Sequence, residues 1–269
     1  MYNTEHKQRF DNEAPAAPEQ LSLLARILNR ETFSTLAEEV GVGHGWRSWD
    51  VGTGDGSVAR WLAARSGATG QVVASDLKPH HVPDHPRIEA IRHDLTSDPW
   101  PEPKFDLIHA RLLLMHLGDR DAIAAKLAGH LRPGGALVIA DWSCPCTSDS
   151  LIKSPADEYT TRIFTEYHRG VHKLGEQTGM DLAWASRVQD VLAAAGYRDI
   201  TVRDYQAPGQ GGEATATLAR LHSFMLEPFL LSQTGLTEAD LAVIRETLLD
   251  PEFEMYTNHL YTTIVRMPK

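Results

Sequence analysis

The stretch that decides the fold reads Asp50-Val51-Gly52-Thr53-Gly54-Asp55-Gly56. A short apolar run, residues 49–51, leads straight into it, and a helical pattern through Val58 and Leu62 follows. Glycines at such a turn let a ligand lie against bare backbone at the N-terminus of the helix. The stretch therefore predicts a strand, a ligand-binding loop and a helix, the opening unit of an α/β fold.

Further apolar runs on both sides of this loop alternate with helical patterns, which is typical of βαβ units in a parallel sheet. Helices are predicted over residues 20–42, 119–131 and 182–195, the last two as covers for the sheet. Arg132-Pro133-Gly134-Gly135 should end the second of them sharply. The predicted strands occupy residues 49–51, 72–74, 88–91, 105–108, 136–140, 200–205 and 261–265.

Two inserts interrupt this alternation. Residues 154–175 form a helical pattern that carries Tyr167, His168 and other aromatic residues. Beyond residue 205, two more helical patterns occupy residues 214–231 and 237–249, the second starting close to a capping box. We interpret both inserts as a substrate cap.

The composition of the 269 residues limits the function classes. A hydrophobic share of 42% and a charged share of 23% are ordinary for a globular protein, and no apolar run is long enough to cross a bilayer. The polar start lacks a signal-peptide core, so cytoplasmic location is the default expectation. A net charge of -10 disfavours nucleic acid as a partner. The oligomeric state stays open, a homo-oligomer included.

Asp76 sits at the end of the second predicted strand, about twenty residues beyond the loop, where a carboxylate accepts hydrogen bonds from ribose hydroxyls. Loop and acid together indicate an adenosine-containing cofactor. A dinucleotide would place pyrophosphate beside Asp50 and Asp55 and a third glycine at Ser57. The two carboxylates suit a sulfonium and an α-ammonium instead, so S-adenosylmethionine is favoured over NAD.

Five ordered motifs between about residues 47 and 141 resemble class I S-adenosylmethionine-dependent methyltransferases, specifically the small-molecule branch of bacterial secondary metabolism. They are the glycine loop, Asp76, His93-Asp94-Leu95, the stretch 105–111 and 131–135. The resemblance implies a Rossmann-like seven-stranded, mostly parallel sheet with helices on both faces, helical cap inserts and an antiparallel last strand. It also implies cofactor contacts at Asp50, Gly52, Thr53, Gly54, Asp76, Leu77, Asp94, Leu95, Ala110 and Arg111.

Combining these patterns, we divide the chain into six segments. A helical lid (residues 1–45) precedes the cofactor-binding core (46–145) and a first cap insert (146–180). Core (181–205), a second cap insert (206–257) and the final strand (258–269) follow.

Catalytic candidates are fewer and rest on residue type. His116 follows the fourth strand and is suited to taking a proton from an acceptor hydroxyl, although a histidine that merely packs behind the cofactor fits the same pattern. Tyr167 and His168 are candidates for the pocket or for a base, with simple cap packing as the alternative. Asp141 is suited either to touching the acceptor or to capping a helix.

The loop histidines His80, His81 and His85 lack the fixed spacing of metal ligands, and we predict no metal. The leading interpretation is methyl transfer to an O, N or C atom of a fairly apolar small molecule, such as a secondary-metabolite intermediate. An NAD-dependent oxidoreductase is the first alternative. A sensor, or a non-methylating enzyme that retains the cofactor on the same fold, is the second.

Overall fold

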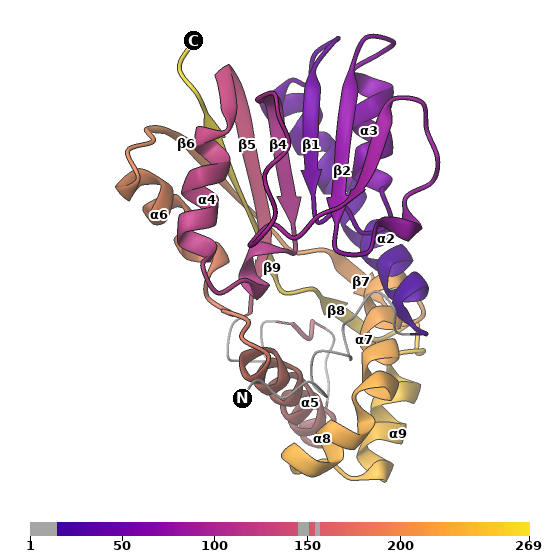
Figure 1. Ribbon diagram of the computed structural model, residues 1–269. Helices are drawn as coiled ribbons and strands as arrows, with labels where there is room; N and C mark the ends of the chain where they lie inside the picture. Colours follow the sequence, from indigo (N-terminus) through magenta and orange to yellow (C-terminus); the bar gives the residue numbers. More distant parts are fainter. Residues whose placement is uncertain (1–14, 145–150, 154–156) are drawn as a thin grey trace. The chain divides into compact units, whose positions relative to one another are not determined.

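The computed structural model describes residues 15–144, 151–153 and 157–269, and it comprises two compact units (Figure 1). We call residues 29–142, 184–205 and 260–269 the core unit. The cap unit contains residues 143–183 and 206–259 as far as they are described, together with residues 15–28. Parts of the predicted lid (1–14) and of the first cap insert (146–150 and 154–156) lie outside the described residues.

The core unit is built on a seven-stranded sheet with the order β3-β2-β1-β4-β5-β9-β6. Strands β1 to β5 pair in parallel, whereas β9 runs antiparallel to β6. The predicted fold class is confirmed. The strands are β1 (Arg47–Val51), β2 (Gln71–Asp76), β3 (Ile88–Arg92), β4 (Phe105–Arg111), β5 (Leu131–Ser143), β6 (Asp199–Tyr205) and β9 (His259–Arg266).

The strand order reverses between β1 and β4, because β2 and β3 lie on one side of β1 and β5 lies beyond β4. In open α/β sheets, ligands bind outside the carboxyl ends of the strands at such a switch point. The loop after β1, residues 52–56, and the turn after β4, residues 112–118, both leave the sheet at this place. The topology therefore brings the predicted cofactor loop beside the segment that carries His116.

Helices cover both faces of this sheet (Figure 1). One face packs against the π-helix η1 (Thr35–Val40) and α3 (Ser57–Arg65), whose Leu36 and Leu62 share a buried cluster with Leu107 and Val138 of the sheet. The other face packs against α4 (Arg120–Gly129) and α6 (Val188–Ala194). Short 3-10 turns are η2 (Pro79–His81), η3 (Leu114–His116) and η5 (Ala185–Arg187).

Three local expectations for the core differ from the structure. The helix expected over residues 20–42 is α2 (Ala17–Ser34), which continues into the wider turns of η1. Helix α6 is shorter than the predicted 182–195 and follows η5. The segment expected to separate helix from strand at residues 132–135 belongs to β5 itself, and the amide of Gly134 donates to Pro268 O at 3.0 Å.

The cap unit has its own apolar core, formed by α5 (Glu158–Gln177), α7 (Ala214–Met225), α8 (Glu227–Gln233) and α9 (Glu238–Thr247). The single helix predicted over 214–231 is two helices, because Pro228 cannot continue α7 but fits the first turn of α8. The predicted capping box is present, with Thr237 and Asp240 bonded reciprocally. A small antiparallel pair, β7 (Pro208–Gln210) and β8 (Glu254–Tyr256), was not predicted.

Candidate active site

The loop after β1 has a backbone that glycine makes accessible. Gly52, Gly54 and Gly56 have φ angles of +67°, +57° and +70°, a region that side chains of L-residues disfavour. At Gly52 an added Cβ would also lie 3.0 Å from the Leu113 side chain. The amides of Gly52 and Thr53 both donate to Ser75 O, at 2.8 and 3.1 Å. The loop is therefore bare, tightly turned and tied to the end of β2.

Asp76 lies at the end of β2 and faces this loop. Its carboxylate accepts hydrogen bonds from the amides of Gly54 (3.1 Å) and Lys78 (3.0 Å). A carboxylate has about four lone-pair sites, so these two bonds leave acceptor capacity for hydroxyl groups. The next side chain, Leu77, is 53% exposed although it is apolar. The structure thus places an acceptor for polar groups beside an uncovered apolar surface.

Asp50, also predicted to bind cofactor, lies beneath the loop and is buried. One carboxylate oxygen accepts from the Thr53 hydroxyl at 2.6 Å, and the other lies 2.7 Å from His109 Nδ1. Both oxygens have protein partners, so Asp50 contributes its charge and fixes the loop. Direct contact with the cofactor stays a prediction. Sequence reasoning gave His109 no role, because its pairing with Asp50 depends on the register of β1 and β4.

The turn after β3 contains Asp94 and Leu95. One oxygen of Asp94 accepts from both the amide (2.9 Å) and the hydroxyl (2.6 Å) of Thr96, and these bonds lower the pKa of Asp94. Leu95 is buried, and its carbonyl accepts from the Trp100 indole at 3.1 Å. The turn is therefore rigid, and its carboxylate is ionised at neutral pH.

At the end of β4, Ala110 is buried and the Arg111 guanidinium donates to Asn29 Oδ1 (3.1 Å) and Thr32 Oγ1 (2.8 Å). Burial lowers the pKa of Arg111, while the carboxylates of Asp50 and Asp55 act in the opposite direction. The positive charge of Arg111 thus interacts with the negative charges of Asp50 and Asp55 near the glycine loop.

Leu112 comes next, with φ at +52°, a left-handed conformation that costs a non-glycine residue about 1–2 kcal/mol. This strained turn redirects the chain, so that Leu113 lies against Gly52. Strained backbone of this kind is common at functional sites.

Asp141, on β5, holds the same turn from the other side. Its buried carboxylate accepts from the amides of Leu113 (2.8 Å) and Met115 (3.2 Å) and from the Trp184 indole (3.1 Å). Burial raises the pKa of Asp141 to about 6, although these hydrogen bonds oppose the rise. Asp141 thus caps a 3-10 turn from the neighbouring strand, and its contact with the acceptor stays a prediction.

His116 ends the turn that Asp141 caps. Its side chain reaches solvent, yet the surrounding protein disfavours the charged ring and, with Arg120, lowers the pKa of His116 to about 4. The imidazole is therefore neutral at pH 7 and keeps a nitrogen that accepts a hydrogen bond.

The other two catalytic candidates belong to the cap unit. Tyr167 is buried in the cap core, where its hydroxyl donates to Ala219 O at 2.7 Å and burial raises its pKa. His168 packs against Phe164 and Tyr167, and burial together with His172 lowers its pKa to about 3. A catalytic role for Tyr167 stays a prediction, which this arrangement disfavours because the hydroxyl proton is already donated to Ala219 O within the cap core. His168 stays a prediction as well.

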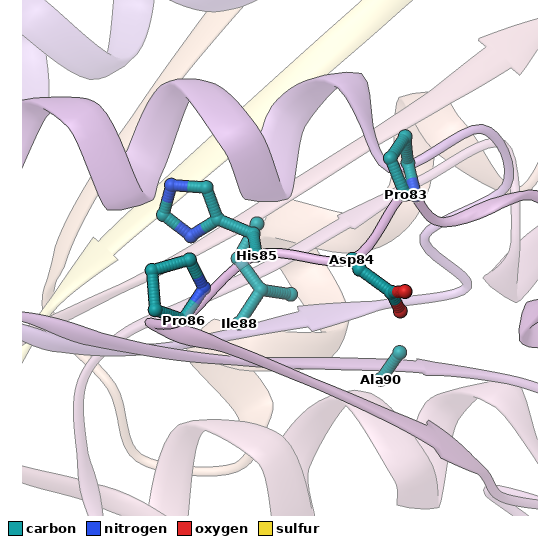
Figure 2. A pocket seen from close by; sticks show the side chains of 6 residues that line it. All are labelled: Pro83, Asp84, His85, Pro86, Ile88 and Ala90. Atoms are coloured by element: carbon teal, nitrogen blue, oxygen red, sulfur yellow. The ribbon is translucent and has the colours of Figure 1, made fainter.

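A separate open pocket borders the edge strand β3 (Figure 2). It is lined by Pro83, Asp84, His85, Pro86, Ile88 and Ala90. The Asp84 and His85 side chains point in different directions in Figure 2, and His85 Nδ1 accepts from the Arg87 amide at 3.2 Å. Within residues 15–144, 151–153 and 157–269, no group of three His, Cys, Asp or Glu side chains is arranged to hold a metal. In the same residues no helix has the length and apolarity needed to cross a membrane.

Known proteins are similar to this chain in sequence and in fold. The family described as "Methyltransferase domain" matches residues 49–139. Methyltransferase GfsG of Streptomyces halstedii is 29% identical over 212 residues, covering 74% of this chain and 75% of the relative.

Two solved structures share the fold. A putative methyltransferase from Bacillus halodurans matches with a TM-score of 0.58 at 15% identity, over 89% of this chain and all of the other. The Haemonchus contortus phosphoethanolamine N-methyltransferase 2, in complex with phosphomonomethylethanolamine and S-adenosylhomocysteine, matches with a TM-score of 0.57 at 16% identity, over 98% and 60%. The methyltransferase domain match and the methyltransferase relative support S-adenosylmethionine-dependent methyltransferase activity in this chain, on the fold that the two solved structures share.

Proposed function

We propose that this enzyme methylates an O, N or C atom of a fairly apolar small molecule, with a secondary-metabolite intermediate as the leading acceptor. The observation that carries the proposal is the cap unit. One of its segments begins at the carboxyl end of β5, and its helices enclose an apolar core of their own. A folded helical module in place of a short loop suits the enclosure of a small molecule. The net charge of -10 argues against nucleic acid as the acceptor.

For the cofactor, we propose that Asp76 accepts hydrogen bonds from the ribose hydroxyls, since it sits at a strand end with free lone pairs. Exposed Leu77 would pack on the adenine face, and Asp94 with the Leu95 amide would bind the adenine edge. Gly52, Thr53 and Gly54 would approach the amino-acid part, beside Ala110 and Arg111. These residues fit S-adenosylmethionine because the loop is bare and two carboxylates favour a cation.

When bound, the cofactor supplies an activated methyl group on a sulfonium. The protein's task is then to place the acceptor atom in line with the methyl carbon, and such positioning accounts for a large part of the rate. His116 is neutral at pH 7 and would accept a hydrogen bond from the acceptor. An imidazole with a pKa of about 4 is a weak base, so orientation is its main proposed contribution and proton removal a secondary one.

Two measurements test this assignment. S-adenosylhomocysteine should raise the thermal midpoint and NAD should not, because only the former fits a loop flanked by carboxylates. Asp76→Ala should weaken binding of S-adenosylhomocysteine about 10- to 100-fold, since two hydrogen bonds to a charged acceptor are lost. The exposed Asp199→Ala, on β6, is the matched control. Stabilisation by NAD alone, or unchanged binding in Asp76→Ala, would contradict the cofactor assignment.

The acceptor itself requires a product. Incubation with S-adenosylmethionine labelled in its methyl group and an extract of the producing organism, followed by mass spectrometry, would reveal which molecule gains the label. Transfer to a polar phosphate ester and to no apolar compound would refute the proposed acceptor class. Labelling of an apolar small molecule would support it and would identify the methylated atom.

A further inference from the structure

A buried histidine and aspartate face each other beneath the glycine loop, in a pair that methyl transfer does not itself require. His109 and Asp50 are partners in the parallel register of β4 and β1. His109 Nδ1 lies 2.7 Å from Asp50 Oδ1, and both residues are almost fully buried, at 1% and 2% exposure. The bond therefore joins the two strands between which the sheet order reverses.

The Asp50 carboxylate continues this connection to the loop. Its second oxygen accepts from the Thr53 hydroxyl at 2.6 Å, and the Thr53 amide is tied to Ser75 O at 3.1 Å. A buried carboxylate fixed at one oxygen presents the other in a defined direction. His109 thus sets the orientation of Asp50, and Asp50 sets the position of Thr53, which lies between the left-handed residues Gly52 and Gly54.

Charge and hydrogen bonding indicate which form of His109 makes this bond. Arg111, on the same strand, already supplies a positive charge that interacts with Asp50. His109 Nε2 is buried and has no hydrogen-bond partner among the residues that the structure describes. An ionised carboxylate only accepts hydrogen bonds, so the proton of this bond lies on Nδ1 and His109 donates to Asp50.

The unpaired Nε2 is itself informative. An apolar side chain of similar size would bury no nitrogen at the position of Nε2, so the ring costs folding stability at that atom. Local departures from optimal folding are expected where function requires them. The gain that accompanies this cost is the bond from Nδ1 to the carboxylate under the loop.

We propose that His109 is a positioning residue for the cofactor: through Asp50 and Thr53 it holds the glycine loop in the conformation that binds S-adenosylmethionine. The inference rests on the proposed assignment of the loop to the cofactor. His109 does not touch the reacting atoms. Its loss therefore affects cofactor affinity and leaves the rate at saturating cofactor nearly unchanged.

The test compares His109→Leu with His109→Asn. Asparagine carries an N–H donor as many bonds from the backbone as Nδ1, whereas leucine carries none. In His109→Leu, the Kd for S-adenosylhomocysteine and the KM for S-adenosylmethionine should rise about tenfold with little change in kcat, because one charge-assisted hydrogen bond is lost. His109→Asn should stay within about threefold of the parent protein in both constants. His44→Leu, on the exposed loop before β1, is the matched control.

A double-mutant cycle with Thr53→Val gives a second test, which does not depend on the folding yield of any single variant. If His109 acts through Thr53, His109→Leu adds little to the loss already caused by Thr53→Val. Losses that multiply to about a hundredfold would overturn the inference. Equal weakening in His109→Asn and His109→Leu would also overturn it, because the hydrogen bond would then not be the cause.

The Asp76→Ala variant separates the two proposals. If Asp76→Ala and Thr53→Val both bind S-adenosylhomocysteine normally, the loop is not the cofactor site and the proposed assignment fails. If both weaken binding while His109→Leu does not, the assignment stands and only the positioning role is refuted.

Discussion

Replacing Asp141 by asparagine should change how stability depends on pH. Asp141 is buried and accepts three hydrogen bonds, yet its pKa is raised to about 6 in the folded enzyme. An unfolded chain has an aspartate pKa of about 3.9. Between these values the folded state binds the proton and the unfolded state does not. Stability from this group is therefore greatest at low pH and is lost as the pH rises through 6.

The magnitude follows from the two pKa values. From pH 7 to pH 5, protonation of folded Asp141 should stabilise the parent enzyme by about 1 kcal/mol relative to Asp141→Asn, which has no carboxyl group to titrate. Urea unfolding of both proteins at several pH values measures the difference. Curves that stay parallel from pH 5 to pH 7 would refute the argument. The difference between the two proteins at pH 7, where Asp141 is mostly ionised, reports the altered hydrogen bonds to Leu113, Met115 and Trp184.

Two further changes test other parts of the site. Gly52→Ala should destabilise the fold by about 1–2 kcal/mol and weaken S-adenosylhomocysteine binding. The reason is that residue 52 has a φ of +67° and that the added Cβ would lie 3.0 Å from the Leu113 side chain. Urea unfolding measures the loss of stability, and calorimetry measures the loss of binding. His116→Ala should lower kcat at least about tenfold with cofactor affinity little changed. Because the pKa of His116 is about 4, kcat should show no titration of this ring between pH 6 and 8, and a kcat equal to that of the parent enzyme would leave His116 a purely structural role.

The sheet could be predicted because each strand is a short apolar run that is visible in the local sequence. All seven predicted strands are present, and the structure mainly lengthens them, as at β5. The two-stranded β7 and β8 could not be predicted, since three-residue strands carry no periodic signal and their pairing joins segments more than forty residues apart. The division of residues 214–231 into α7 and α8 was in principle readable, because Pro228 marks it.

Some features of the candidate site could be predicted from the sequence and others could not. The glycine loop and Asp76 could be placed from sequence because their positions relative to strand ends are fixed by topology. The pairing of His109 with Asp50 could not, because a one-residue change in register turns a side chain to the opposite face. The hydroxyl of Tyr167 donates to Ala219 O, and Ala219 lies 52 residues further along the chain. Helical spacing predicted an aromatic face but not the partner that covers it.

The apolar core of the cap unit is assembled from two stretches that are separated in sequence by α6 and β6. Phe164 of the first stretch stacks on Phe253 of the second, at 5.0 Å between ring centroids. Neither stretch can bury its apolar face before the other has been synthesised. If the cap unit selects the acceptor, as proposed, a transplant of acceptor preference between relatives must carry both stretches together. A graft of one alone would leave mismatched apolar faces, and loss of soluble expression would precede any change of specificity.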